Sequence, residues 1–426
     1  MKILYVSQYF PPEIGAPSAR VSELARHWVR MGHQVEVLTG FPNHPTGKVP
    51  AEYRRKLWRL TCREDLAGVQ VRRTWLLPFA NRKPWERILN YTSFCLSACV
   101  TGTFLDRPDV IIATSPQLLV ALAGWWLRVV HGVPFIFEVR DIWPESLTGV
   151  GLGSEQSLLH RALGAIASFL YRRSDHIVVV TPAFRDYLAE KWSVPLEKMS
   201  VVENGVELEL FSPEGDRHPL GDAPELRGKF IVSYIGTLGM AHGLETVLQA
   251  AAQLQQRAPD VAFLLIGEGS EKERLVAMAN ALGLSNVHFL PQQPKGAIPG
   301  LIRASDVCLV LLKNAEIFKT VLPTKLLEFL ACGRPVVLGV NGHARDILQQ
   351  AGGGIAIDPE DAFSLVSAIS RLRDNPELRR RMGQQGRAYV SRNFSRQTTA
   401  RKYGELLQRL RRDKTSAQRA KGVTAG

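Results

Sequence analysis

The segment Pro323–Val337 contains the residues of this 426-residue chain best suited to binding an anionic ligand. It reads PTKLLEFLACGRPVV, in which Pro-Thr suits a helix start, Thr324 could cap the helix and Gly333 could end it. The first backbone amides of a helix bind phosphate readily, and Lys325 adds positive charge at the same place. Glu328 follows one turn later and could accept hydrogen bonds from two ribose hydroxyls. The pattern therefore predicts a phosphate and ribose site, although an ordinary helix start would use the same residues.

Alternating strand and helix patterns determine where this segment lies. Short apolar strands are expected in the first half at Lys2–Ser7, Gln34–Gly40, Asp109–Ser115, Pro134–Asp141 and His176–Pro182. A second series follows from about residue 229, with KFIVSYIG, VAFLLIGEG, NVHFLP, VCLVLL, PVVLGV and GGIAI. Strands of this kind, separated by helices, predict parallel sheets covered on both faces. The expected fold class is α/β, with two Rossmann-like doubly wound domains facing a cleft that binds the ligand.

Composition suggests the boundaries of these domains. Residues 1–205 would form the first domain, and 206–228, rich in Pro and Gly, would be a linker. Residues 229–392 would form the second domain, which contains the segment described above. An amphipathic helix at 393–412 would return to the first domain, and 413–426 would be a basic flexible tail.

The distribution of charge points to an anionic partner for the two ends of the chain. Residues 1–100 contain 15 Lys+Arg and 7 Asp+Glu, and residues 371–426 contain 16 and 4. No nucleic-acid-binding pattern accompanies this charge, so nucleic acid is not an expected partner. Arginines alternate with large apolar residues in Tyr53–Leu60 and Arg82–Phe94, which favours an anionic membrane surface over nucleic acid; solvated helix faces are the alternative.

Other features restrict the class of protein. The longest apolar run, Leu118–Val130, is shorter than the roughly 18 residues that span a bilayer, and it contains Arg128. Five scattered cysteines and a first strand without a signal peptide predict a reducing cytoplasm. Cys95 and Cys99 lie one helical turn apart, but nothing nearby completes a metal site. No Asp-x-Asp occurs, so a metal-bridged diphosphate is not expected.

Taken together and in order, several motifs resemble family 4 of the retaining glycosyltransferases, which have the GT-B fold. They are PPEIGAPSARVSELA, GHQVEVLTG, VVENGVELELF, YIGTLGMAHGLETVL, LLIGEGSEKERL, ASDVCLVLL and PTKLLEFLACGRPVV. The resemblance covers nearly all of residues 1–410. PFIFEVRD, EVRDIWPES and NHPTG further resemble the WbuB-like branch, whose members are assigned to amino-sugar transfer in O-antigen and capsule synthesis.

The resemblance implies a donor site. Gly15 would bring backbone amides to the donor diphosphate, with Thr324 and Lys325 binding the same group and Glu328 holding the ribose. The loop Gly236–Gly243 would lie beside the phosphates and the sugar; the residues named from it are Gly236, Thr237, Gly239 and His242. Glu268 and the segment Phe289–Gln292 would lie near the base.

Three positions depart from the family pattern. The first of two glutamates that the family commonly has falls at Thr320, so contact with the donor sugar could pass to Glu316, Lys319 or Thr320. The usual phosphate-clamping Arg and Lys correspond to Thr237 and His242, so positive charge must come from Lys325, with Lys319 or Arg20 as further candidates. A frequent His-Asp pair is Arg140-Asp141 here. We expect an acceptor-side role for Asp141 and a phosphate-binding or acceptor-orienting role for Arg140; a strand-end ion pair is the alternative.

The implied reaction is metal-independent, retaining transfer from a nucleotide sugar, with UDP favoured, and it needs no cofactor. The implied acceptor is a glycan linked to polyprenyl diphosphate at the inner face of the plasma membrane, and the donor sugar could be an N-acetylated amino sugar. A nucleotide-sugar 2-epimerase and a non-catalytic nucleotide-sugar-binding homologue are the alternatives. A Rossmann dehydrogenase is not expected, because no G-x-G-x-x-G follows the first strand.

Overall fold

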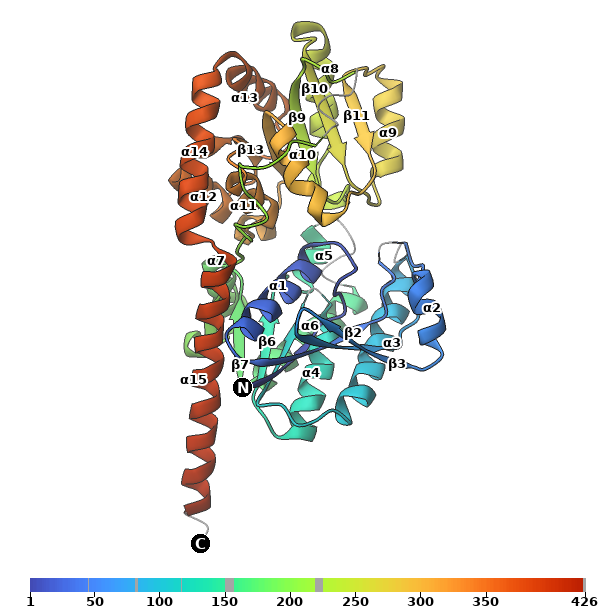
Figure 1. Cartoon of the computed structure of the whole chain (residues 1–426), viewed down its shortest axis with the longest axis vertical. Coiled ribbons are helices and arrows are strands. Elements are labelled where there is room, and N and C mark those ends of the chain that lie inside the picture. Colours follow the sequence, from blue (N-terminus) through green and yellow to red (C-terminus); the bar gives the residue numbers. More distant parts are fainter. Residues whose placement is uncertain (45, 81–82, 116, 150–156, 219–224, 424–426) are drawn as a thin grey trace. The chain divides into compact units, whose positions relative to one another are not determined.

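The protein is described from a computed structural model that covers residues 1–44, 46–80, 83–115, 117–149, 157–218 and 225–423. The chain divides into two compact units (Figure 1). The first unit comprises Met1–Thr148, Gly153–Glu203 and Arg396–Gly426. The second comprises Asn204–Ser395 and the short segment Gly149–Leu152. The chain therefore leaves the first unit and returns to it at its last helix.

The first unit is built on a sheet that, in the described residues, has the strand order β3-β4-β2-β1-β5-β6-β7-β8. The strands are β1 Lys2–Val6, β2 Gln34–Gly40, β3 Thr61–Leu66, β4 Val69–Thr74, β5 Val110–Thr114, β6 Phe135–Val139, β7 His176–Val179 and β8 Met199–Val201. The apolar runs expected as strands are strands, because continuous apolar residues suit a sheet that is buried on both faces. The expected strands pair parallel to one another, and the additional strand β3 pairs antiparallel with β4. The sequence of β3, TCREDL, is polar and lies at the sheet edge, so it shows no apolar alternation.

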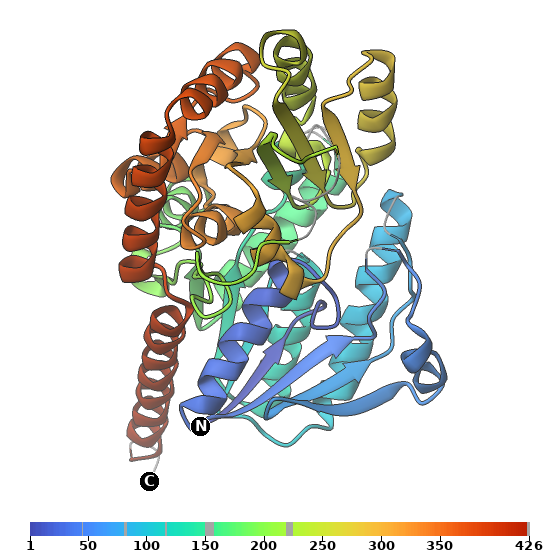
Figure 2. The same ribbon diagram turned by 45° about the horizontal axis from the view of Figure 1, so that its top comes forward.

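Helices cover both faces of this sheet. They are α1 Ala16–Arg30, α2 Ala51–Leu57, α3 Pro84–Thr103, α4 Leu118–His131, α5 Glu145–Gly149, α6 Leu158–Arg173, α7 Pro182–Trp192 and α15 Arg396–Val423. Along β1, Ile3 and Tyr5 join a core cluster that includes residues of α1 and α15. Figure 2 shows α1 lying along the sheet of the first unit. Alternate residues of a strand point to opposite faces, so Leu4 points away from that cluster.

Helix α15 packs on α1 within the first unit. The Trp28 indole Nε1 donates to the Ala400 carbonyl at 2.9 Å, and the Trp28 and Tyr403 rings lie 5.3 Å apart in an edge-on arrangement. The helix continues to Val423, so the flexible tail expected from residue 413 is helical over most of its length. The segment DKTSAQRAKG lacks proline and is rich in good helix formers, which explains the difference.

The second unit contains a parallel sheet whose described strands have the order β11-β10-β9-β12-β13-β14. The strands are β9 Phe230–Ile235, β10 Val261–Ile266, β11 Val287–Leu290, β12 Val307–Leu311, β13 Val336–Gly339 and β14 Gly354–Ala356. The helices are α8 Glu245–Arg257, α9 Lys272–Ala281, α10 Ile298–Ala304, α11 Thr324–Ala331, α12 His343–Ala351, α13 Ala362–Asp374 and α14 Pro376–Asn393. Two doubly wound α/β units are therefore confirmed.

The segment 206–228, expected as a linker, belongs to the second unit. Phe211 and Leu226 are buried in its core, and the Val206 amide donates to the Phe394 carbonyl at 2.8 Å. The segment is rich in Pro and Gly because its backbone forms mostly turns and irregular structure while its apolar side chains pack on the second unit. Among the described helices of both units, none combines the length and the apolar character needed to cross a bilayer.

Candidate functional site

The predicted phosphate site lies at the start of α11 in the second unit. Pro323 occupies the cap position with φ −61° and ψ 125°, and Thr324 is the first helical residue, so the expectation that Thr324 caps the helix was wrong. The fixed φ of proline suits this entry into a helix. No side chain caps α11, and no acidic residue lies in its first turn. This helix end thus retains the positive dipole that favours an anion.

Lys325 is held on the ring of Tyr234, which projects from β9. Its Nζ lies 2.9 Å from the Tyr234 hydroxyl and 4.0 Å from the ring centroid. Burial lowers the pKa of Lys325 to about 7, and the charge of Glu328, one turn further along α11, opposes this effect. A buried lysine without a full counter-charge binds an anion strongly, because the anion supplies the charge that burial disfavours.

The loop after β9 reaches the same place through Gly236. This residue has φ +147°, and a Cβ added there would lie 2.7 Å from the Lys325 Nζ. The Gly236 amide donates to the Ile266 carbonyl at 2.9 Å, and the Leu238 amide donates to the Glu268 carbonyl at 2.9 Å. The loops after β9 and β10 are thus joined backbone to backbone beside Lys325. Glycine at 267 allows the loops to meet, since a Cβ there would lie 1.9 Å from the Gly236 carbonyl oxygen, and glycine at 236 leaves room for the Lys325 ammonium.

Replacing Gly236 by alanine tests this close approach. The positive φ is strained for alanine, at a cost of about 1–3 kcal/mol, and the new methyl group would displace the Lys325 ammonium. We expect a lower melting temperature of the second unit together with weaker binding of nucleotide. Calorimetry and a UDP titration measure the two effects, and unchanged UDP affinity would contradict the placement of Lys325.

His242 also contacts Tyr234, with ring centroids 5.7 Å apart in an edge-on arrangement. Its Nδ1 is 3.2 Å from the Leu311 carbonyl, which can only accept, so Nδ1 donates and Nε2 is an acceptor in the neutral ring. Burial, and then the charge of Lys325, lower the pKa of His242 to about 3. His242 is therefore neutral near pH 7 and does not replace the family's phosphate-clamping cation. At position 237, the other departure from the family pattern, the Thr237 carbonyl accepts a hydrogen bond from the Tyr234 hydroxyl at 2.8 Å.

The remaining donor-side candidates lie in two other places. Lys319 and Glu316 form an ion pair at 2.5 Å in the short helix η5 Glu316–Thr320, and the Thr320 hydroxyl donates to the Ile317 carbonyl at 2.6 Å. Glu268 pairs with Lys272 at 2.6 Å. The structure thus brings Gly236, His242 and Lys325 together around Tyr234, whereas Lys319 is already paired. Gly239 begins the turn η3 Met240–His242 that carries the histidine.

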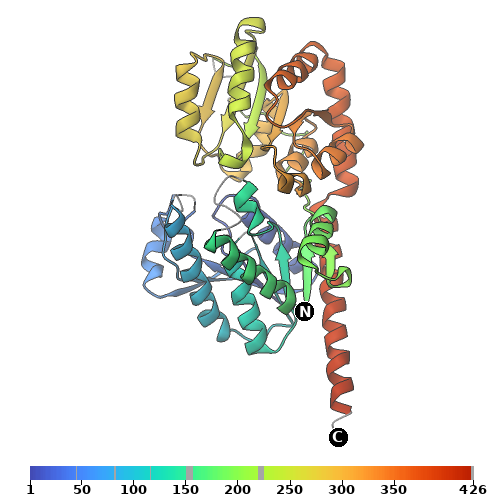
Figure 3. The same ribbon diagram turned by 180° about the vertical axis from the view of Figure 1, so that it is seen from behind.

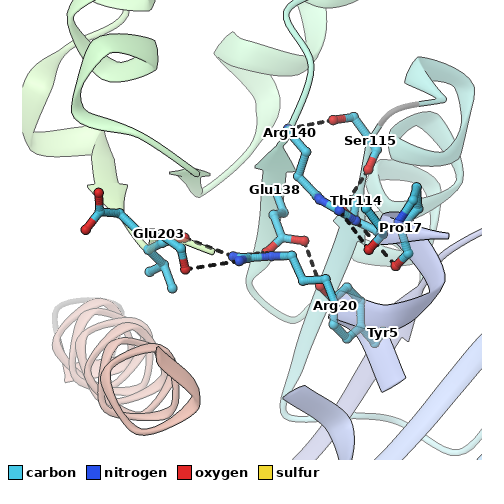
Figure 4. A network of polar contacts seen from close by, with 10 residues as sticks. Tyr5, Pro17, Arg20, Thr114, Ser115, Glu138, Arg140 and Glu203 are labelled. Carbon is cyan, nitrogen blue, oxygen red and sulfur yellow. Dashed lines mark hydrogen bonds and ion pairs between the residues drawn. The ribbon is translucent and has the colours of Figure 1, made fainter. Parts of the chain in front are cut away.

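In the first unit, Gly15 precedes α1 with φ +148°, and no side chain caps this helix. The Arg140 guanidinium donates to the carbonyls of Ala16 at 3.1 Å and Pro17 at 3.4 Å, so it holds the start of α1 (Figure 4). Asp141 follows β6, its amide donates to the Ser115 hydroxyl oxygen at 3.1 Å, and burial raises its pKa to about 6. An acid with this pKa suits a role beside a reacting hydroxyl.

Arg20 is not available to a donor phosphate. Its guanidinium makes two bonds, of 3.0 and 2.9 Å, to one carboxylate oxygen of Glu138, and both side chains are fully buried (Figure 4). It also donates to the carbonyls of Val202 at 3.0 Å and Glu203 at 3.2 Å. The suggestion that Arg20 supplies charge to the diphosphate was wrong, because its charge is neutralised inside the first unit.

Sequence reasoning missed Tyr234 and Glu138. Glu138 interrupts the apolar run PFIFEV, and Tyr234 is a phenol in the buried strand within KFIVSYIG. A polar or phenolic group inside a buried strand needs a partner, which was the available signal.

Two family descriptions match the chain in sequence. "Glycosyl transferase 4-like domain" matches residues 15–205, and "Glycosyl transferases group 1" matches residues 222–389. The colanic acid biosynthesis glycosyl transferase WcaI of Escherichia coli (strain K12) is 29% identical over 386 residues, which cover 87% of this chain and 91% of WcaI. The glycosyltransferase WbjE of Pseudomonas aeruginosa is 24% identical, over 66% of this chain and 70% of WbjE.

Solved structures share the fold. Sucrose-phosphate synthase from Thermosynechococcus elongatus superimposes with a TM-score of 0.76 at 20% identity, over 96% of this chain and 98% of that one. Anabaena Alr3699/HepE, in a complex with UDP and glucose, gives a TM-score of 0.73 at 19% identity, over 96% and 99% of the two chains. The two α/β units, the two matching family descriptions and these neighbours lead to one conclusion: the chain belongs to the family 4 glycosyltransferases, which have the GT-B fold.

Proposed function

We propose that this enzyme transfers a sugar from a UDP-linked donor to a lipid-linked glycan, with retention, in bacterial surface polysaccharide synthesis. The observation that carries the donor half is the Lys325 ammonium, held on Tyr234 at the uncapped start of α11. Surface polysaccharide synthesis is supported by the name of WcaI, a colanic acid biosynthesis glycosyl transferase. Uracil as the base of the donor is supported by the complex of HepE with UDP. An N-acetylated amino sugar is the donor group to test first.

Each group at the donor site has a role in this proposal. The diphosphate lies at the start of α11, where the amides of Thr324 and Lys325 and the Lys325 ammonium bind it. Glu328 accepts hydrogen bonds from the ribose, and Glu268 lies near the base. The bond from the sugar to the phosphate oxygen breaks while the acceptor oxygen bonds to the anomeric carbon on the same face. The acceptor proton passes to a donor phosphate oxygen, so the main task of the protein is to stabilise the departing diphosphate.

Acceptor-side roles fall to the first unit. Arg140 positions the first turn of α1, next to Gly15, because its guanidinium holds the Ala16 and Pro17 carbonyls. Asp141 orients the acceptor hydroxyl.

In the second unit, Glu316 and Thr320 are the candidates for contact with the donor sugar.

A transfer assay tests the proposal. UDP-sugars are screened by thermal shift, since a bound donor raises the melting temperature by mass action. The donor found is then incubated with a polyprenyl-diphosphate glycan, with and without EDTA. We expect release of UDP only with the acceptor, and an unchanged rate in EDTA because the chain has no Asp-x-Asp.

Two results would contradict this function. Conversion of the free nucleotide sugar without acceptor would indicate a 2-epimerase. Donor binding without any turnover, together with unchanged cellular glycan after Glu328→Ala and Asp141→Ala, would indicate a non-catalytic homologue.

A further inference from the structure

Helix α3 of the first unit buries the polar Asn90 and Ser93 along with the apolar Phe94 and Ala98, and it exposes several large apolar side chains. A surface helix usually buries apolar residues and exposes polar ones. In α3 the polar side chains bond inward: the Asn90 amide donates to the Leu77 carbonyl at 2.7 Å, and the Ser93 hydroxyl accepts from the Leu77 amide at 2.9 Å. Thr101 bonds the Thr74 hydroxyl at 2.8 Å. The segment after β4 thus takes up the hydrogen bonds of α3, and the outward side is left apolar.

The outward side of α3 is exposed and uncharged. Its exposed apolar residues are Trp85, Ile88, Leu89, Leu96 and Val100, with Phe104 directly after the helix. Leu96 is 62% exposed, Val100 63% and Phe104 83%. The stretch 88–105 contains no charged residue. We call this surface, with its continuation on α4, the α3–α4 face.

Helix α4 extends this surface. Trp126, Val129 and Val130 are exposed, and the Trp126 indole Nε1 donates to the Thr103 hydroxyl at 3.1 Å, which ties the two helices together. Figure 3 shows α3 and α4 next to each other at the surface of the first unit. Contiguous apolar surface of this kind marks a site for a protein or a membrane.

The charge of the units decides between these partners. The first unit has 33 Lys+Arg and 20 Asp+Glu, whereas the second has 20 and 20, so the whole net charge of +13 belongs to the unit with the α3–α4 face. A second copy on this face would bring two strongly positive units together. An anionic lipid surface would attract the unit and also accept its apolar side chains.

We propose that the α3–α4 face inserts among the acyl chains of an anionic membrane. Trp85 and Trp126 suit the boundary between headgroups and acyl chains, where amphipathic rings are preferred. The net positive charge of the unit attracts it from solution, and the apolar face holds it at the membrane. The proposal rests on the proposed function for its purpose, because a lipid-linked acceptor lies in a membrane; its evidence is independent of the donor site.

The test is flotation with vesicles made of equal parts of phosphatidylcholine and phosphatidylglycerol. We expect the wild-type protein to float with the vesicles and to stay bound in part at high salt, since apolar insertion is not screened. The double substitution Leu96→Glu with Val100→Glu should lower the bound fraction at least about tenfold, because burial of even one such side chain is worth about 1.5–3 kcal/mol.

A control is Phe363→Glu, which places one negative charge, against two in the double variant, on an exposed apolar residue of the second unit. It should bind vesicles like the wild type. The donor-induced thermal shift should be the same in all three proteins, which shows that the variants are folded and keeps failure of this proposal separate from failure of the proposed function.

Three outcomes would overturn the insertion proposal. The first is a wild-type protein that does not float, and the second is a double variant that floats equally well. The third is a wild-type dimer that the double variant abolishes, with no vesicle binding by either, which would assign the face to a second copy of the chain.

Discussion

Replacing Lys325 by methionine is expected to lower kcat for sugar transfer by about 100- to 1000-fold, the usual loss when one preorganised charge at a developing anion is removed. Methionine keeps the unbranched shape and can still cover the Tyr234 ring, so the fold should persist. The paired Lys319 and the neutral His242 leave Lys325 to carry the charge at the start of α11. Steady-state kinetics with purified acceptor measure the effect.

The control is Lys229→Met, which removes an exposed lysine next to the opposite end of β9. It should leave kcat within about twofold of the wild-type value, as surface substitutions away from a site usually do. If both variants lost the same activity, the effect would come from net charge and not from the position of Lys325.

The same lysine sets a pH dependence. Its pKa of about 7 means that the free enzyme loses this charge as pH rises through neutrality. kcat/KM reports the free enzyme, so it should fall above about pH 7 in the wild type and lose this descending limb in Lys325→Met. A profile that is unchanged by the substitution would show that another group titrates.

Glu138→Gln is expected to destabilise the first unit by about 3–5 kcal/mol, since it leaves the fully buried Arg20 without its counter-charge. The glutamine is nearly isosteric and can still accept from the Tyr5 hydroxyl, which bonds Glu138 at 2.6 Å. The loss should therefore come from charge and not from a cavity. Calorimetry should show one transition lowered and the other unchanged.

Asp260→Asn is the matched control, because Asp260 also makes two bonds to an arginine, Arg373, but at the surface of the second unit. Exposed pairs are worth about 0–1 kcal/mol, so a small effect is expected. If both variants lost the same free energy of unfolding, burial would not determine how much an arginine–carboxylate pair contributes to stability.

The Glu138 effect should also depend on pH. Burial alone would raise the pKa of Glu138, but the charges of Arg20 and Arg140 hold it below its ordinary value. Its contribution is complete above the unfolded pKa of about 4.3 and is lost as pH falls through the folded value. The difference between wild type and Glu138→Gln should therefore shrink in acid.

Much of the fold could be predicted because its strands are continuous apolar runs, as in QVEVLTG, which forms β2 from Gln34 to Gly40 as expected. Strand β3 was missed because an edge strand needs no apolar pattern. The start of α11 was found from Pro-Thr and the following lysine, which are local signals. Arg20 was misjudged because its partner lies 118 residues away in the sequence, and burial of a charge is decided by such distant contacts.

The Arg82–Phe94 segment is a second case in which contacts with distant residues could not be predicted from the local sequence. Its arginines and large apolar residues alternate in the sequence, which suggested a basic surface. In the structure the polar residues Asn90 and Ser93 are buried beside Phe94, because the chain after β4 offers them backbone partners. Which side of a helix faces the protein interior therefore depends on such partners as well as on the spacing of apolar residues in the helix.

The return of the chain to its first unit has a consequence for biosynthesis. Trp28 and Glu23 of α1 are covered by Ala400 and Arg396, which are made only after the whole second unit. At about 5–20 residues per second, the 192 residues of 204–395 take roughly 10–40 s to synthesise. During that interval the nascent first unit has an exposed tryptophan and a carboxylate without its arginine. The second unit can fold on the ribosome before the first is complete, and chaperones would find their binding surface on α1.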